Sequence, residues 1–255
     1  MKTGGQTIRA ILRKNFGRHH CDMLLREEAK EQDWRWVKKC YPRLQSVRGH
    51  CVVPRDEKFE ALFPEARYYT FLRDPAARAV SHFLFRERSG DQLSPWRDWL
   101  EENGNYFCRR LAGEASAEAA IEVLRTTIGF VGLVEKFDES LLLWAAWSGL
   151  EKPDLTFRKV NESPGKPDNI DELLKQAERA NSEDRRLFRF ALEEIFPAQR
   201  EAYPGDLSED RFRLRVGQAK ARNWNLKSLS GSLVRNGRYR KGIREIGSLP
   251  KVGDS

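Results

Sequence analysis

The chain of 255 residues has few cysteines, no long apolar stretch and no internal repeat. Its four cysteines show no CxxC spacing, which argues against a zinc site, and we expect mostly buried or free thiols in a reducing compartment. No stretch of 18 apolar residues is present, so the sequence predicts no transmembrane segment. The expectation is therefore a globular protein without a metal.

The positive charge is concentrated at the end of the chain. Residues 209–255 contain 12 Lys and Arg against four Asp and Glu, so this segment holds the whole formal net charge of +8. We therefore predict one domain over 1–208 and a basic extension over 209–255. The extension either attracts a polyanion, such as a sulfated glycan, nucleic acid or a lipid surface, or is a solvated helix and coil.

The segment KTGGQT at 2–7 has the composition of a phosphate-binding loop. Its paired glycines let backbone amides turn toward one point, and an apolar pattern of helical spacing over 6–16 follows at once. The positive end of that helix adds to the charge of Lys2, while Thr3 or Thr7 supplies a hydroxyl. The sequence therefore predicts an anion site made by Lys2, Thr3, Gly4, Gly5, Gln6 and Thr7.

A second segment, TFLRDPAARAVSHF at 70–83, predicts another anion site. An apolar run ends at Arg73 and Asp74, where Pro75 begins a helix. That helix presents Arg78 and Ser81 within two turns. Arg73 and Ser81 can converge on an anion, since a guanidinium matches phosphate oxygens, and Asp74 is expected to cap the helix. Two separated anion sites indicate a ligand phosphorylated at both ends.

At these residues the chain resembles the sulfotransferases that use 3′-phosphoadenosine 5′-phosphosulfate (PAPS). It is most similar to the carbohydrate branch, which includes heparan sulfate 2-O-sulfotransferase and bacterial enzymes. In that family a PKTGG-T-type loop holds the 5′-phosphosulfate, and an LRDP…R..S segment holds the 3′-phosphate. A third stretch, GFVGLVEKFDESLLLW at 129–144, is similar to the family's strand and helix after its variable middle. The resemblance covers roughly residues 1–200.

The resemblance implies transfer of a sulfuryl group from PAPS to an acceptor hydroxyl, with a glycan as the expected acceptor and no metal. Lys2 and the amides of the glycine loop would stabilise charge on the departing phosphate. His50 lies in VRGHCVV at the position of the family's GH motif and would be the catalytic base. The alternative is a structural histidine at a strand end. His19 and His20 are expected to be exposed, and His82 to have a packing or helix-surface role.

Strands that alternate with helices predict an α/β fold with a mainly parallel sheet of P-loop type flanked by helices. We expect strands at 47–53, 67–73, 129–134 and 155–160. Helices are expected at 6–16, 22–40, from 75 onward, and at 115–127, 137–147, 168–180 and 183–196, the last ended by Pro197. In the family a buried strand leads into the glycine loop. Here the chain begins at Met1, so we expect the first strand to be missing at the N-terminus.

Two other functions stay open. A P-loop kinase requires GxxxxGK[ST], whereas here the lysine precedes the glycines. A non-catalytic polyanion-binding protein derived from a truncated sulfotransferase would depend on the basic extension. No secretory signal precedes the first motif, so a cytoplasmic location, as in bacteria, is expected. The Golgi lumen is expected instead if an upstream anchor is missing from this chain.

Overall fold

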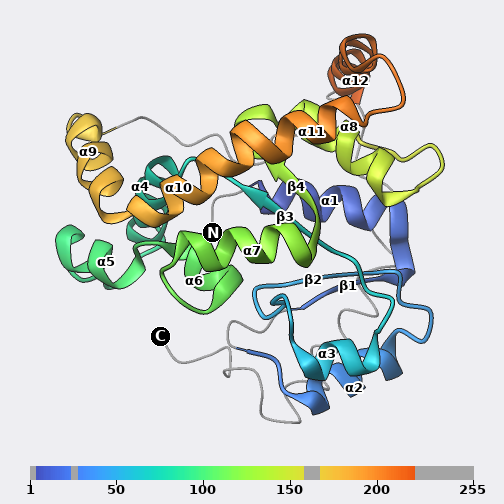
Figure 1. The fold of residues 1–255 in the computed structure, drawn as a ribbon, viewed down its shortest axis with the longest axis horizontal. Coiled ribbons are helices and arrows are strands. Elements are labelled where there is room, and N and C mark those ends of the chain that lie inside the picture. Colours follow the sequence, from blue (N-terminus) through green and yellow to red (C-terminus); the bar gives the residue numbers. More distant parts are fainter. Residues whose placement is uncertain (1–3, 24–27, 158–166, 222–255) are drawn as a thin grey trace. The chain divides into compact units, whose positions relative to one another are not determined.

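The computed structural model describes residues 4–23, 28–157 and 167–221 (Figure 1). This part of the chain is mixed α/β, mainly helical, with two small parallel sheets. It divides into two compact units. Unit 1 comprises residues 4–5, 67–155 and 167–217, and unit 2 comprises residues 6–66 and 156–157.

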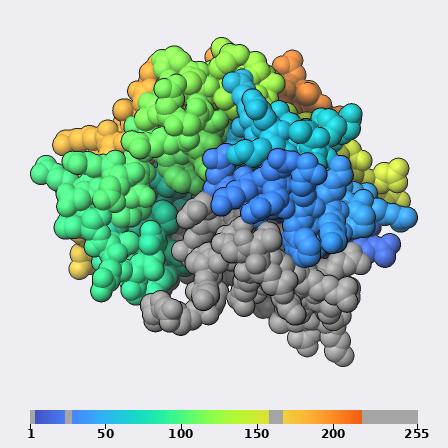
Figure 2. Space-filling model, turned by 90° about the horizontal axis from the view of Figure 1, so that it is seen from below, coloured from blue at the N-terminus to red at the C-terminus, as the bar shows by residue number. Residues whose placement is uncertain are grey.

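Unit 2 contains the sheet formed by β1 and β2. The two strands are parallel, with Cys21 opposite Val47. Helix α1 packs through Ile8, Ile11 and Leu12, which recur at the helical spacing that the sequence predicted. On the face shown in Figure 2 the described N-terminal residues, in blue, form one continuous surface. The elements of unit 2 are α1 (Gly5–Phe16), the short 3₁₀ turn η1 (Gly17–His19), β1 (His20–Asp22), α2 (Glu31–Cys40), β2 (Ser46–Arg48) and α3 (Glu57–Leu62).

Unit 1 is built around the parallel pair β3 and β4. Helices α7, α8 and α11 pack on β4, so most of the residues of this strand are buried (Figure 1). The strands are β3 (Tyr68–Leu72) and β4 (Ile128–Leu133). The helical elements are α4 (Pro75–Arg88), α5 (Trp96–Asn103), α6 (Tyr106–Ala112), α7 (Ala117–Thr126), η2 (Val134–Lys136), α8 (Phe137–Ser148), α9 (Ile170–Ala180), α10 (Ser182–Phe190), η3 (Ala191–Ile195), α11 (Phe196–Glu201) and α12 (Leu207–Ala221).

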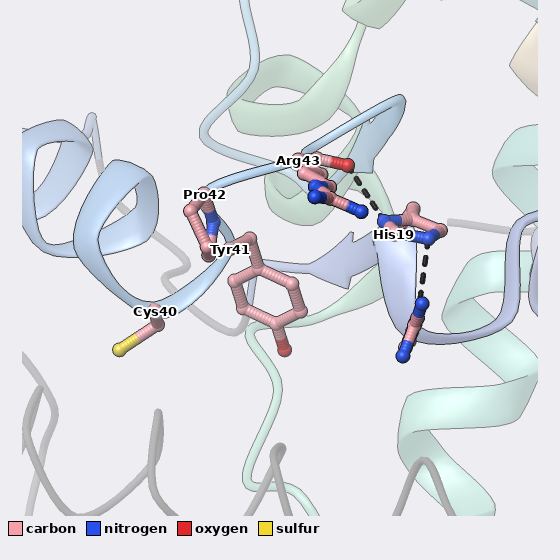
Figure 3. Close-up of a pocket in the computed structure, with 6 residues that line it drawn as sticks. His19, Cys40, Tyr41, Pro42 and Arg43 are labelled. Carbon is pink, nitrogen blue, oxygen red and sulfur yellow. Dashed lines mark hydrogen bonds between the residues drawn. The ribbon is translucent and has the colours of Figure 1, made fainter.

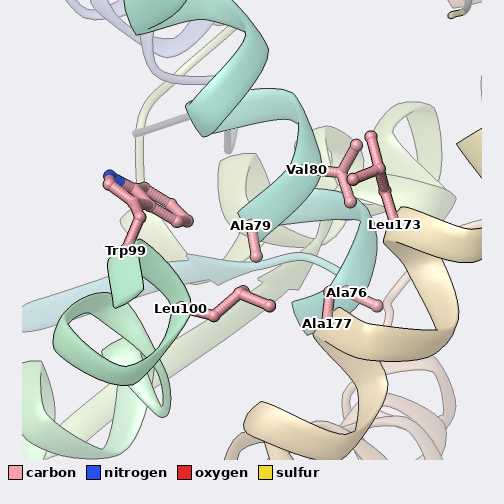
Figure 4. Packing of buried hydrophobic residues seen from close by; sticks show 7 residues of the cluster. All are labelled: Ala76, Ala79, Val80, Trp99, Leu100, Leu173 and Ala177. Carbon is pink, nitrogen blue, oxygen red and sulfur yellow. The ribbon is translucent and has the colours of Figure 1, made fainter. Parts of the chain in front are cut away.

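Helix α4 is held in place by a dense apolar cluster. Small residues on α4, Ala76 and Ala79, let α9 approach closely, and α9 fills the space with Leu173 and Ala177. The indole of Trp99 closes the cluster from α5 (Figure 4). Because α4 carries Arg78 and Ser81, this packing fixes the position of both side chains in unit 1.

The strands agree with the sequence in unit 1 and differ in unit 2. The predictions at 67–73 and 129–134 are confirmed by β3 and β4. The strand predicted at 47–53 ends at Arg48, because its partner β1 offers only three residues. The sequence did not predict β1. The helix expected at 22–40 is shorter in the structure, where α2 covers only Glu31–Cys40. Residues 155–157 form no strand, and the rest of the strand predicted at 155–160 lies outside the described residues.

The prediction that Pro197 ends a helix is wrong. The helical run continues from α10 through the π-helical turn η3 into α11, and Pro197 lies in the first turn of α11. A π-turn shifts the backbone hydrogen-bond register by one residue. Pro197 has no amide to donate to the preceding helical turn, and the π-helical turn η3 lies directly before α11.

Candidate functional site

The described part of the glycine loop begins at Gly4, since Lys2 and Thr3 lie outside the described residues. Gly4 has φ +68°, the left-handed region that favours glycine. A Cβ at this position would also lie 3.0 Å from Cε2 of Phe137. Gly5 then begins α1, where Gln6 is exposed and Thr7 is half-buried. The glycine at position 4 is therefore required by the backbone and by the close approach of an aromatic ring.

Arg73 lies at the corner between β3 and α4. Asp74 Oδ1 accepts a hydrogen bond from the Ala77 amide at 2.7 Å, which confirms the predicted cap. The Asp74 amide donates to Glu135 Oε1 at 2.9 Å. Arg73 is half-buried: burial lowers the pKa of its guanidinium, and the negative charges of Glu135 and Asp74 oppose that effect. The corner thus holds a partly desolvated cation next to two carboxylates.

Arg78, on the buried face of α4, is the most unusual side chain of unit 1. It is fully buried, and its guanidinium lies 4.6 Å from the centre of the Tyr106 ring. Its Nη2 donates to the Asn103 carbonyl at 3.2 Å, whereas Nε and Nη1 have no hydrogen-bond partner among the described residues. Burial lowers the pKa of Arg78; Asp184 opposes this, and the positive charge of Arg73 adds to it. Arg73 and Arg78 therefore place two cations near each other.

The sequence placed Arg78 on the helix of the second predicted anion site, but it was not assigned a binding role. The available signal was its position among the apolar residues Ala76, Ala79 and Val80, where a charged side chain has to be buried. Ser81 follows three residues later on α4 and is half-buried. Residues three apart on a helix share a face, so Arg78 and Ser81 are neighbours on α4.

A reciprocal capping arrangement supports the helices around Arg78. The buried carboxylate of Asp184, on α10, accepts hydrogen bonds from the amides of Phe107 (2.9 Å) and Cys108 (2.8 Å) at the start of α6. Asn105, just before α6, accepts in return from the amides of Glu183 (3.1 Å) and Asp184 (3.2 Å) at the start of α10. Each helix is therefore capped by a side chain from the other.

The histidines fall into different environments. His50 is exposed in the turn after β2. The prediction that His20 is exposed is wrong: its side chain is buried in unit 2, where Nε2 donates to Asp22 Oδ1 at 3.2 Å. His19 is only partly exposed and donates from Nδ1 to the Arg43 carbonyl at 2.8 Å. His82 packs edge-on against Trp99, with ring centres 5.6 Å apart, which agrees with the packing role expected for it.

The predicted site residues are distributed over both units. Unit 1 contains Gly4, Gly5, Arg73 and Ser81, and the last two lie on the continuous segment from β3 into α4. Unit 2 contains Gln6, Thr7 and His50. The convergence of these two groups on one ligand stays a prediction.

A surface pocket of about 330 Å³ lies in unit 2, and none of the predicted site residues lines it (Figure 3). His19 forms one wall, and Arg18 Nε donates a hydrogen bond to His19 Nε2 at 3.3 Å. Two arginines give the pocket positive charge. Its lining residues are Arg18, His19, Cys40, Tyr41, Pro42 and Arg43.

Three comparisons with known proteins, against family models, curated proteins and solved structures, gave no match. Within residues 4–23, 28–157 and 167–221, no cluster of three or more His, Cys, Asp or Glu side chains is arranged to hold a metal ion. No helix in the same described ranges combines the length and the apolar character needed to cross a membrane. A function for this chain must therefore be argued from its own residues.

Proposed function

We propose that this chain is a sulfotransferase that moves a sulfuryl group from PAPS to an acceptor hydroxyl of a carbohydrate. The observation that supports it most is the corner between β3 and α4. There a strand end presents the half-buried Arg73, and Asp74 caps the helix that carries Ser81. This order of parts is the one that an LRDP…R..S segment needs to hold a phosphate: first a strand, then an arginine, then a capped helix.

The glycine loop supplies the second half of the proposal. Gly4 adopts a left-handed conformation directly before α1. The first amides of an α-helix have no partner within the helix, which suits this end of α1 to an anion. Lys2 would add a full positive charge at the departing phosphate, as catalytic and binding residue together. The proposed reaction requires no metal, because Lys2 and the backbone amides would stabilise the negative charge that develops on the departing phosphate.

The fold and the base belong to the same proposal. The parallel pairing of β3 with β4, covered by helices, is compatible with a P-loop-type sheet. His50 is exposed in a turn, where a substrate hydroxyl can reach its imidazole, and we assign it as the catalytic base. The hydroxyl proton would pass to His50 while the oxygen attacks sulfur, and the 5′-phosphate of the nucleotide would leave.

Binding of adenosine 3′,5′-bisphosphate tests the donor site. At a ligand concentration of about 100 times Kd, a specific ligand stabilises the folded protein by about 2.7 kcal/mol, a rise in Tm of roughly 5–10 °C for a chain of this size. We expect this shift in the wild type and its loss in Arg73→Ala. Arg97→Ala, which removes an exposed arginine of α5 in the same unit, is the matched control and should keep it. A wild type that the bisphosphate does not stabilise would refute the proposal.

Turnover with PAPS tests the base. His50→Ala should lose sulfuryl transfer but keep its affinity for the bisphosphate, whereas His19→Ala should retain both. Full turnover in His50→Ala would remove that assignment. Salt-sensitive binding to heparin, together with no binding of the bisphosphate, would instead favour the non-catalytic polyanion-binding protein.

A further inference from the structure

Two apolar side chains of α12 lie next to each other on the surface of unit 1. Phe212 is 68% exposed and Val216 is 39% exposed. The two residues are four apart on one helix, so they share a face of it. Within the described ranges Phe212 is the most exposed of the large apolar side chains. We call Phe212 and Val216 the apolar pair.

The other side of α12 is attached to unit 1. Leu214, between the two members of the apolar pair in the sequence, is buried. Arg211 Nη1 lies 2.6 Å from Glu139 Oε1, at the start of α8. Arg215 Nε lies 2.9 Å from Asp138 Oδ2, in the same turn of α8 (Figure 1). These contacts hold α12 in an orientation that leaves the apolar pair in contact with solvent.

The sequence that follows the apolar pair is strongly basic. Residues 217–255 contain nine Lys and Arg against two Asp and Glu. Proteins that bind at a membrane surface combine two such features. Exposed apolar side chains enter the boundary between headgroups and acyl chains, and nearby Lys and Arg are attracted by anionic lipids. The apolar pair and the basic sequence therefore match an anionic lipid surface.

Other partners match only one of these features. A sulfated glycan is attracted by the basic residues, but it offers little apolar surface to the apolar pair. A nucleic acid can stack a base on Phe212, whereas Val216 has no π-system on which a base can stack. A second copy of the chain would need far more apolar surface, because a stable interface buries about 800 Å² per partner. The combination favours the membrane.

We propose that Phe212 and Val216 insert into the surface of an anionic membrane, to which the basic sequence after them attracts the protein. In this arrangement the protein lies on the membrane surface. Apolar insertion and charge attraction each give weak and reversible binding, so both are needed. The inference goes beyond the proposed sulfotransferase and does not depend on it.

Co-sedimentation of the full chain with lipid vesicles tests the apolar pair. The probes are vesicles of phosphatidylcholine and vesicles of an equal mixture with phosphatidylserine. The wild type should bind the anionic vesicles about tenfold or more tightly than the neutral ones. Phe212→Gln/Val216→Gln should bind the anionic vesicles about tenfold more weakly than the wild type, because glutamine keeps the helix but removes the apolar surface.

A matched double variant controls for the loss of exposed apolar surface elsewhere. Phe85→Gln/Leu192→Gln changes two residues that are 46% and 39% exposed on α4 and η3. This variant should bind the anionic vesicles within about twofold of the wild type, since exposed positions outside the contact contribute little. Equal losses in the two double variants, or a wild type without preference for anionic vesicles, would overturn the proposal.

Single variants of Phe212 separate insertion from a structural role. Phe212→Trp keeps an aromatic ring at this position, and tryptophan favours membrane interfaces, so binding to the anionic vesicles should be at least as tight as in the wild type. Phe212→Gln should bind more weakly. Losses of the same size in both variants would show that the ring is not inserted, which would overturn the proposal.

The charge contribution has its own pair of variants. Arg240→Gln/Lys241→Gln should weaken binding to the anionic vesicles about tenfold, because basic residues near an anionic surface add to the attraction. Arg185→Gln/Arg189→Gln removes the same charge from exposed positions of α10 and should stay within about twofold of the wild type. Equal losses would show attraction by total charge alone and overturn the proposal.

Two further measurements identify the other occupants. The wild type and Phe212→Gln/Val216→Gln should bind heparin equally, because apolar side chains contribute little to binding a hydrated polyanion. A wild type that binds heparin or duplex DNA but neither kind of vesicle would assign this surface to a polyanion. A wild type that is dimeric in sedimentation, while the same double variant is monomeric, would assign the apolar pair to a second copy of the chain. Either result overturns the membrane proposal.

Discussion

The guanidinium of Arg78 lies 4.6 Å from the centre of the Tyr106 ring and is completely buried. A cation over an aromatic face is stabilised by the quadrupole of the ring, which offsets part of the cost of burying the charge. A second ring, that of Phe107, lies 5.8 Å away. The aromatic start of α6 therefore forms one side of the site in which this arginine is held.

We predict that the volume of Arg78 contributes more to stability than its charge does. Arg78→Met keeps most of the volume and removes the buried charge, so the free energy of unfolding should fall by less than about 1 kcal/mol. Arg78→Ala leaves a cavity and should cost about 2–4 kcal/mol. Urea unfolding of the three proteins measures the difference. If Arg78→Met and Arg78→Ala lose the same free energy of unfolding, the charge of Arg78 is needed and its volume is not.

The glycine at position 4 can be tested against a glycine with the same backbone conformation. Gly4 and Gly90 have φ of +68° and +78°, but a Cβ at Gly90 meets nothing within 4 Å, whereas at Gly4 it lies 3.0 Å from the Phe137 ring. Both alanine variants incur the left-handed strain of about 1–2 kcal/mol, and Gly4→Ala should lose about 1 kcal/mol more. Thermal unfolding compares them. Adding Phe137→Leu should recover part of the loss in Gly4→Ala, and no recovery would contradict the role of the ring.

Asn105 is expected to contribute to stability in two ways. Its side chain caps α10, and its φ of +49° is left-handed, a conformation that asparagine tolerates better than alanine. Asn105→Gly keeps the backbone but loses the cap, which should cost about 1 kcal/mol, and Asn105→Ala should cost about 2 kcal/mol. Asn169, at the start of α9, makes no capping hydrogen bond with its side chain, so Asn169→Ala is the control. Equal losses at the two positions, measured in urea, would contradict the capping role.

The surroundings of Asp22 predict a specific dependence of stability on pH. Burial alone raises the pKa of Asp22, but the hydrogen bond from His20 and the charges of His20, Arg9 and Arg13 outweigh it, so the net pKa is well below the ordinary value. A carboxyl whose folded-state pKa is lowered stabilises the protein above its unfolded pKa of about 3.9 and loses that contribution as the pH falls further.

Wild-type protein should therefore lose stability more steeply than Asp22→Asn as the pH is lowered from about 5 to 2. Urea unfolding at several pH values in this range measures the two slopes. Asp98→Asn, at an exposed position of α5, serves as the control and should follow the wild type. Parallel curves for wild type and Asp22→Asn would show that the arginine cluster does not favour the ionised carboxylate.

Local signals carried most of the successful predictions. Asp74 and Pro75 fix the start of α4 because a cap and a proline act within one turn of the chain. The apolar runs of β3 and β4 are long enough to indicate buried strands. By contrast β1 has three residues, two of them polar, and its burial depends on arginines from α1 and β2 that lie elsewhere in the sequence. No local pattern could indicate that strand.

The sequence alone determined the glycine pair at the start of α1, the cap of α4 and the concentration of positive charge after residue 208, because each depends on residues close together in the chain. Only the tertiary structure decided that Arg78 is buried against Tyr106, that His20 is inside unit 2, and that three arginines surround Asp22. The physical reason is that burial and charge balance are set by neighbours in space, and those neighbours come from segments far apart in the sequence.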